Sequence, residues 1–149
     1  MRANILIVEA RFYADISNSL LEGAIAALER AAVGFERVTV PGALEIPPAI
    51  LFASGAARNG GKSFDGYVAL GCVIRGETYH FEIVANQSAA GLMQLSLENG
   101  LCIGNGILTC ESEEQALARA SRDGLDKGGD AARACLALIE TRARLREKP

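Results

Sequence analysis

Short apolar runs alternate along this chain with segments of helical periodicity, and this alternation limits the folds that it can adopt. Residues 5–8 and 67–70 are continuous apolar runs, which are typical of strands buried on both faces. Residues 35–40 alternate apolar and polar side chains, and residues 101–109 form a fourth apolar segment around two glycines. Four strands separated by helical segments predict an α/β sandwich around a four-stranded parallel sheet.

The helical segments carry their own start and stop signals. Asp15 is a candidate cap for the first helix, which we expect to end at Gly34. Pro47 suits the first turn of the second helix, and residues 112–115 match a capping box. The remaining two helices are expected over about residues 79–98 and 130–146.

Composition places the chain among ordinary globular proteins. At 149 residues it has the length of one domain, and it can bury a core large enough to fold without a disulfide or a metal. Half of the residues are hydrophobic and 22% are charged, and the formal net charge of −3 comes without a basic stripe. This balance argues against a nucleic acid as a partner.

The distribution of apolar residues and cysteines predicts a cytoplasmic location. Glu9 and Arg11 interrupt the N-terminal apolar run before it reaches the length of a signal peptide, and no stretch approaches the roughly 20 apolar residues of a membrane span. Four cysteines lie far apart in the sequence, as expected for thiols in a reducing compartment. One histidine and no CxxC pair argue against a metal site.

Residues 71–82 concentrate the candidate chemistry. They follow a buried apolar run and precede a long helical pattern, so they are expected to join the carboxyl end of a strand to the start of a helix. Open parallel sheets bind ligands at this place, and a helix start offers free N–H groups and a positive dipole end to an anion. Gly76 would let the backbone approach a phosphate, and Thr78 would add a hydroxyl donor.

His80 is the only histidine of the chain, and it lies directly after this loop. An imidazole takes up and releases protons near neutral pH, which suits a proton shuttle. A histidine at a helix start can equally be a structural residue that a local backbone group satisfies. The adjoining phosphate loop favours the catalytic interpretation.

Five further residues are candidates because of their position. Phe12 and Glu45 follow the first two strands, Asn105 lies between two glycines, and Arg119 and Lys127 lie on the C-terminal helices. An arginine can clamp a phosphate and a lysine can supply a point charge. Each residue also has a plainer interpretation: core packing for the phenyl ring, dipole compensation for the carboxylate and a solvated surface for the two cations. No GxSxG, Walker or GxGxxG motif is present.

Together these motifs resemble the lumazine synthase family, over about residues 4–144. The resemblance rests on Arg11-Phe12, residues 41–47 (PGALEIP), 71–80, 106–109 and 114–116, Arg119-Ala120 and Lys127-Gly128. It implies a flavodoxin-like three-layer sandwich and a condensation that needs no cofactor. The substrates would be 5-amino-6-(ribitylamino)uracil and 3,4-dihydroxy-2-butanone 4-phosphate. The products would be 6,7-dimethyl-8-ribityllumazine, phosphate and water, in the penultimate step of riboflavin biosynthesis.

The resemblance also assigns roles residue by residue. His80 would be the proton shuttle, Arg119 would clamp the phosphate, and Lys127 would line the same pocket. The other implied substrate contacts are Phe12 stacked on the pyrimidine, Ala43, Leu44 and Glu45 on the ribityl chain, the backbone of Cys72, Val73 and Ile74 on the pyrimidine edge, and Glu77 and Thr78 around the phosphate.

Two residues depart from the family pattern. Asn105 stands where many members carry an aromatic residue against the pyrimidine, and Tyr13 stands where asparagine is frequent. The family forms homopentamers, some of which pair into decamers or close into 60-subunit shells. In such a ring Phe12, Glu45 and His80 of one subunit would share a site with Asn105, Arg119 and Lys127 of the next.

Two other functions fit a fold of this class. One is a protein that binds flavin or lumazine, or forms a shell, without catalysis; retention of the candidate cations beside the single histidine argues against it. The other is a flavodoxin-like electron carrier. The absence of tryptophan and the small number of aromatic residues argue against that function, because an isoalloxazine ring needs flanking aromatic side chains.

Overall fold

One sheet of four parallel strands organises the computed structural model, which describes residues 3–147. The strands are β1 (Asn4–Ala10), β2 (Gly34–Val40), β3 (Gly66–Ile74) and β4 (Ile103–Cys110), and their order in the sheet is β2-β1-β3-β4. The predicted four-stranded parallel sheet is therefore confirmed. β1 and β3 lie at its centre, while β2 and β4 form its two edges.

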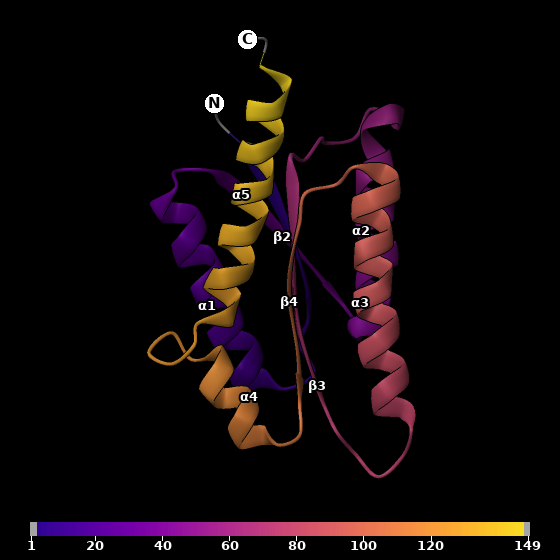
Figure 1. The fold of residues 1–149 in the computed structure, drawn as a ribbon, viewed down its shortest axis with the longest axis vertical. Helices are drawn as coiled ribbons and strands as arrows, with labels where there is room; N and C mark the ends of the chain where they lie inside the picture. The colour runs from indigo at the N-terminus through magenta and orange to yellow at the C-terminus, as the bar shows by residue number, and fades with distance from the viewer. Residues whose placement is uncertain (1–2, 148–149) are drawn as a thin grey trace.

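Helices cover both faces of this sheet (Figure 1). On one face lie α1 (Ala14–Arg30), α4 (Glu113–Ala120) and α5 (Lys127–Arg146); on the other lie α2 (Ile46–Ala56) and α3 (His80–Asn99). Two short 3₁₀ helices, η1 (Ala43–Glu45) and η2 (Ala57–Asn59), flank α2. These layers confirm the flavodoxin-like three-layer sandwich.

The two faces of β1 belong to two separate hydrophobic cores. Ile5 and Ile7 pack with α1, α4 and α5, whereas Leu6 and Val8 pack with α2 and α3. Successive side chains of a strand point to opposite faces, so a strand between two helical layers buries both of its faces and is mostly apolar. This burial explains the continuous apolar run that the sequence shows at residues 5–8.

The glycines of β4 allow close packing against α5. A Cβ atom at Gly104 would overlap the carbonyl oxygen of Ala131, and one at Gly106 would lie 3.0 Å from the Cβ of Ala131. Glycine within a strand often marks a close approach of a ligand or of backbone. At Gly104 the approaching group is the backbone of α5, whereas at Gly106 the nearest atoms are the carbonyl oxygen of Ala69 and Cδ2 of Leu70 in β3, each 2.8 Å away.

Several predicted boundaries were wrong. Asp15 lies inside the first turn of α1 and Tyr13 holds the cap position. The helix ends at Arg30, because Ala32 adopts a left-handed φ of 57° and the N–H of Val33 bonds to the carbonyl of Leu28. This is the geometry of a Schellman-type stop, here without the glycine that usually provides it.

Gly34, the expected end of the first helix, is instead the first residue of β2. Two later boundaries also differ from expectation. The last helix begins at Lys127, three residues earlier than expected, and the fourth strand begins only at Ile103. The capping box is partly confirmed: Ser112 Oγ accepts a bond from the N–H of Gln115, but the Gln115 side chain accepts from the N–H of Glu111.

Candidate active site

A cavity of about 430 Å³ opens at the carboxyl ends of β1 and β3, at the lower end of the sheet in Figure 1. Its lining comes from the β1–α1 turn, the segment between β2 and α2, the end of β3 and the start of α3. Eight residues to which the resemblance assigned a role lie in this lining: the expected proton shuttle His80 and seven expected substrate contacts, Phe12, Ala43, Leu44, Glu45, Cys72, Val73 and Ile74. The fold thus brings together residues that are up to 68 positions apart, from Phe12 to His80.

The end of β3 offers backbone groups to this cavity. Pairing between β1 and β3 runs only from Ile5↔Gly66 to Glu9↔Leu70, whereas β3 continues to Ile74 along β4. Beyond Leu70, the edge of β3 that faces β1 therefore has no strand beside it. Its N–H and C=O groups can bind a planar ligand that carries its own donors and acceptors.

Phe12 stands at the rim of the cavity with 76% of its surface exposed. Its one aromatic neighbour within residues 3–147 is Tyr13, whose ring lies edge-on at a centroid distance of 5.0 Å. Tyr13 is itself half-buried, and burial, with smaller effects from Cys72 and Glu113, raises the pKa of its hydroxyl. A phenyl face left open in this way is suited to stack on a flat ligand.

The segment before α2 forms the opposite wall. Ala43, the first residue of η1, is buried, whereas Glu45 at the end of η1 is exposed and its carboxylate lies over Gly42. The N–H of Glu45 bonds to the carbonyl of Gly42 at 3.1 Å, which holds the turn together. An exposed carboxylate above a small-residue wall can accept hydrogen bonds from hydroxyl groups of a ligand.

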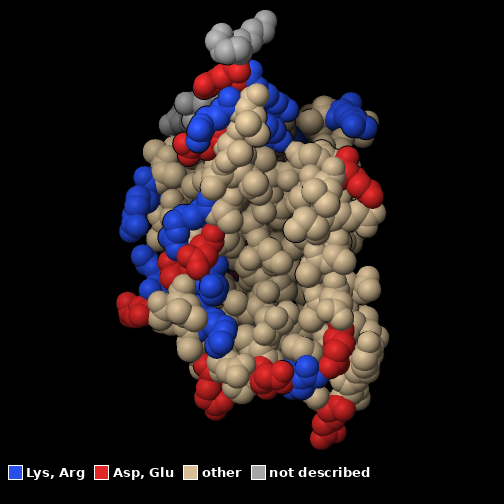
Figure 2. Space-filling model, viewed as in Figure 1, with Lys and Arg blue, Asp and Glu red and all other residues tan. Residues whose placement is uncertain are grey.

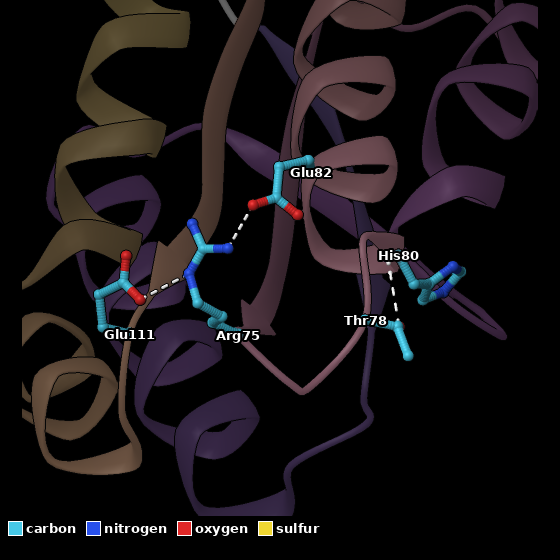
Figure 3. A network of polar contacts seen from close by, with 5 residues as sticks. All are labelled: Arg75, Thr78, His80, Glu82 and Glu111. Atoms are coloured by element: carbon cyan, nitrogen blue, oxygen red, sulfur yellow. Dashed lines mark hydrogen bonds and ion pairs between the residues drawn. The ribbon is translucent and has the colours of Figure 1, made fainter.

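The loop that was expected to bind phosphate and the single histidine lie at the N-terminus of α3, as expected from the sequence. Residues 75–79 form an exposed loop, and His80 is the first residue of a 20-residue helix. The N–H of His80 points to Thr78 Oγ1 at 3.4 Å (Figure 3). Glu77 and Thr78 do not line the cavity themselves, but they precede His80, which does.

Arg75 braces this loop from the other side. Its guanidinium bonds to Glu82 in the first turn of α3 and, at 2.7 Å, to Glu111 after β4, and it lies 4.4 Å from the centroid of the Phe81 ring. Figure 3 shows Arg75 and the two carboxylates on one side of the loop, and Thr78 and His80 on the other. Two carboxylates already pair with this cation, so it is a brace for the loop rather than a free anion site.

Cys72 contributes a neutral thiol to the cavity wall. Burial, with a smaller effect from neighbouring Cys110, raises the pKa of Cys72 to about 12. A thiol with so high a pKa carries almost no thiolate at neutral pH. The cavity therefore does not use this cysteine as a nucleophile.

Asn105, Arg119 and Lys127 do not line the cavity within one chain. Asn105 is exposed on the edge strand β4, and its side-chain oxygen accepts a bond from the N–H of Ile107 at 2.9 Å. Arg119 bonds to the carbonyl of Gln115 in α4, and Lys127 pairs with Asp130 at 3.5 Å at the start of α5. Both cations belong to helices on the face opposite α3.

Four residues at this end of the sheet were not recognised from the sequence. Val84 lines the cavity one helical turn after His80, so its spacing could have identified it. Tyr13 also lines the cavity, and the sequence marked it only as a departure. Arg75 pairs with Glu111, which lies 36 residues further along the chain, so no local signal identifies that contact. Glu9 pairs with Arg11 only two residues away, but the sequence does not show that this carboxylate is buried.

Residues 3–147 contain neither a membrane-spanning helix nor a metal-binding cluster of side chains. No helix there is long and apolar enough to cross a membrane. No group of three or more histidine, cysteine, aspartate or glutamate residues in that range is arranged to hold a metal ion.

Comparisons with known proteins agree with the geometry. Residues 2–143 match the model of the 6,7-dimethyl-8-ribityllumazine synthase family. The chain is 59% identical to 6,7-dimethyl-8-ribityllumazine synthase 1 of Rhizobium meliloti (strain 1021), over 95% of this chain and 93% of that protein. It is 57% identical to 6,7-dimethyl-8-ribityllumazine synthase of Agrobacterium fabrum (strain C58), over 97% of each. On the family match and these identities, the chain belongs to the 6,7-dimethyl-8-ribityllumazine synthase family.

Proposed function

We propose that the cavity at the ends of β1 and β3 is where this enzyme condenses 5-amino-6-(ribitylamino)uracil with 3,4-dihydroxy-2-butanone 4-phosphate. The observation that carries the proposal is the convergence of seven expected substrate contacts and the expected proton shuttle, from four segments, on one cavity. The reaction yields 6,7-dimethyl-8-ribityllumazine, phosphate and water. The pyrimidine amine forms an imine with the ketone, phosphate is eliminated and the ring closes.

The cavity can hold the pyrimidine between a ring and a strand edge. The exposed face of Phe12 stacks on the ring, and backbone groups of Cys72, Val73 and Ile74 bond to its edge. The ribityl chain lies along η1, where the Glu45 carboxylate accepts bonds from its hydroxyl groups. The neutral thiol of Cys72 fits this mechanism, because the substrate amine is the nucleophile and no protein nucleophile is required.

The phosphate lies on the loop before α3. N–H groups at Glu77 and Thr78, together with the positive end of the α3 dipole, stabilise its charge. His80, exposed at the first position of that helix, moves protons during imine formation and elimination. Positioning the two substrates provides the remaining rate enhancement, because a bimolecular condensation becomes effectively unimolecular.

Asn105, Arg119 and Lys127 complete the site from a neighbouring subunit of a homopentamer. Two features support this. These residues lie away from the cavity of their own chain, and the cavity is open enough to leave Phe12 exposed. Exposed apolar side chains also remain on two helices: Leu51 and Phe52 on α2, and Ile83, Met93 and Leu97 on α3. Figure 2 shows a broad uncharged face over β4 and α3. A ring buries such a face with one repeated heterologous contact.

We place the reaction in the cytoplasm. All four cysteines are free thiols, and three of them are buried in the core on the α1 face of the sheet. Thiols persist in a reducing compartment. The chemistry needs no cofactor, since the amine and the ketone that react are both carried by the substrates.

A turnover assay tests the proposal against its main alternative. We expect the purified protein to form the lumazine product from both substrates, followed by its absorbance. A protein that binds flavin in a titration but forms no product above the uncatalysed rate would be the non-catalytic paralogue instead.

Subunit mixing tests the shared site. His80→Ala and Arg119→Ala proteins, each of low activity, are refolded together in equal amounts. If subunits mix at random in a closed ring, roughly one interface in four pairs an intact His80 with an intact Arg119. The mixture should then recover about a quarter of the wild-type activity. A mixture that exchanges subunits, as shown by mass spectrometry, yet gives only the average of the two mutants would rule out the shared site.

A further inference from the structure

Glu9 is the only charged residue among residues 3–147 that is buried, with 1% of its surface exposed. It occupies the penultimate position of β1, between Thr39 of β2 and Leu70 of β3. The alternation along the strand places its side chain on the α1 face, in line with Ile5 and Ile7. A buried carboxylate is costly unless charged partners surround it, so its presence calls for a reason.

The main partner of Glu9 is Arg11. Arg11 Nη1 donates to Glu9 Oε1 at 2.7 Å, and Arg11 Nη2 donates to the side-chain oxygen of Asn18 in α1. The second oxygen, Oε2, makes no hydrogen bond and lies 3.5 Å from Arg37 Nη1 of β2, an ion pair without hydrogen-bond geometry. The guanidinium of Arg11 therefore spans the turn from the end of β1 to the second turn of α1.

This turn contains Phe12. The only residues between β1 and α1 are Arg11, Phe12 and Tyr13. Phe12 itself is too exposed for core packing to hold it, since 76% of its surface is open. The charged clamp on Arg11 and the edge-on contact with Tyr13 are the contacts that fix the backbone and ring at this position.

We propose that Glu9 is a positioning residue: through Arg11 it clamps the β1–α1 turn and holds the Phe12 ring in the orientation that stacks on the pyrimidine. The inference rests on the proposed stacking role of Phe12. Glu9 touches neither substrate. The clamp increases the affinity for the pyrimidine. It does not affect the affinity of the phosphate loop, because Arg75 holds that loop separately.

Glu9→Leu separates this role from a contribution to stability. Leucine has a similar size and joins Ile5 and Ile7 on the same face, and well-packed apolar residues replace buried ion pairs without loss of stability. Arg11 and Arg37 keep access to water, since their side chains are 27% and 55% exposed. We therefore expect an unchanged or higher Tm, together with a higher KM for 5-amino-6-(ribitylamino)uracil.

The size of the effect is bounded by Phe12→Ala. Losing a stacked aromatic contact raises the KM for the pyrimidine by roughly tenfold. Misplacing the ring should raise it several-fold and no further, with the KM for the butanone phosphate unchanged. In the Phe12→Ala background Glu9→Leu should have no additional effect, because the ring that Glu9 positions is gone.

Two further variants complete the test. Asn18→Ala removes the other anchor of Arg11 at an exposed position and should act in the same direction as Glu9→Leu, even if the leucine variant fails to fold. Glu36→Gln is the matched control. This glutamate also lies in the sheet and pairs with Lys62 at 2.9 Å, but it is near the amino end of β2, whereas Glu9 is near the carboxyl end of β1.

The outcomes distinguish the two proposals. If Phe12→Ala raises the KM for the pyrimidine but Glu9→Leu and Asn18→Ala do not, the clamp is refuted and the stacking role stands. The clamp is also refuted if the effects of Glu9→Leu and Phe12→Ala multiply. If Phe12→Ala leaves that KM unchanged, the stacking role fails and the clamp falls with it.

Discussion

Gly76→Ala should leave the free enzyme intact and weaken the binding of the butanone phosphate. A Cβ atom at Gly76 would meet no heavy atom within 4 Å, and Gly76 does not adopt a positive φ. An alanine at such a position removes conformational freedom from the unfolded chain and stabilises a protein by about 0.4–1 kcal/mol. The substitution should therefore not lower the stability of the free enzyme, and its effect should appear only when a ligand binds to the loop.

The proposed phosphate site makes the same methyl group harmful. The phosphate oxygens need the backbone of residues 76–78 at hydrogen-bond distance, and a methyl group at position 76 occupies part of that space. Losing one charge-assisted hydrogen bond costs about 1.5–3 kcal/mol, which corresponds to roughly a ten- to hundredfold increase in KM. The KM for the pyrimidine should stay within about twofold of wild type, because the proposed place of that ring is along β3 and Phe12, away from this loop.

The assay measures initial rates with each substrate varied while the other is saturating, and calorimetry measures Tm. Gly55→Ala is the matched control: it also has no heavy atom within 4 Å and lies in the last turn of α2. It should raise Tm without changing either KM. An unchanged KM for the butanone phosphate in a folded Gly76→Ala protein, or an equal rise in both KM values, would refute the phosphate loop.

Two other substitutions test the proton shuttle and the phosphate clamp. His80→Ala should slow turnover by roughly 10²–10⁴-fold without changing Tm, since it removes a general acid–base from an exposed position; wild-type turnover in this variant would end the assignment. Arg119→Ala should raise the KM for the butanone phosphate far more than that for the pyrimidine, and Arg119→Lys should restore only part of the affinity, because an ammonium group lacks the planar fork of a guanidinium. Equal changes in both KM values would count against a phosphate role.

The central strands could be predicted because a strand that is buried on both faces appears in the sequence as a continuous apolar run. Ile5, Ile7 and Val8 are fully buried, and the run that contains them marks β1 without any other information. The end of α1 could not be found in the same way. It depends on a left-handed φ at Ala32, and an alanine carries no sign of that conformation.

The candidate site was predictable where its residues form contiguous motifs. Residues 41–47 and 71–80 lie next to the cavity in blocks, so a family pattern locates them together. Glu9 shows the opposite case. In the sequence it looks like a polar residue that ends the apolar run at residue 8, whereas β1 continues to Ala10 and buries it. Its burial depends on Arg11 and Arg37, and only the folded chain shows that pairing.

The reaction explains why polar clamps lie beside this cavity. Both reacting groups belong to the substrates, so the main contribution of the protein to the rate is to hold the two groups at the correct distance and orientation. Loops at strand ends are mobile unless something ties them down, and the pocket itself is too open to fix its own walls. Arg11 ties the turn that carries Phe12, and Arg75 ties the loop that leads to His80. A substrate that meets walls already held in place loses less binding energy to ordering them, and more of that energy is left to align the amine with the ketone.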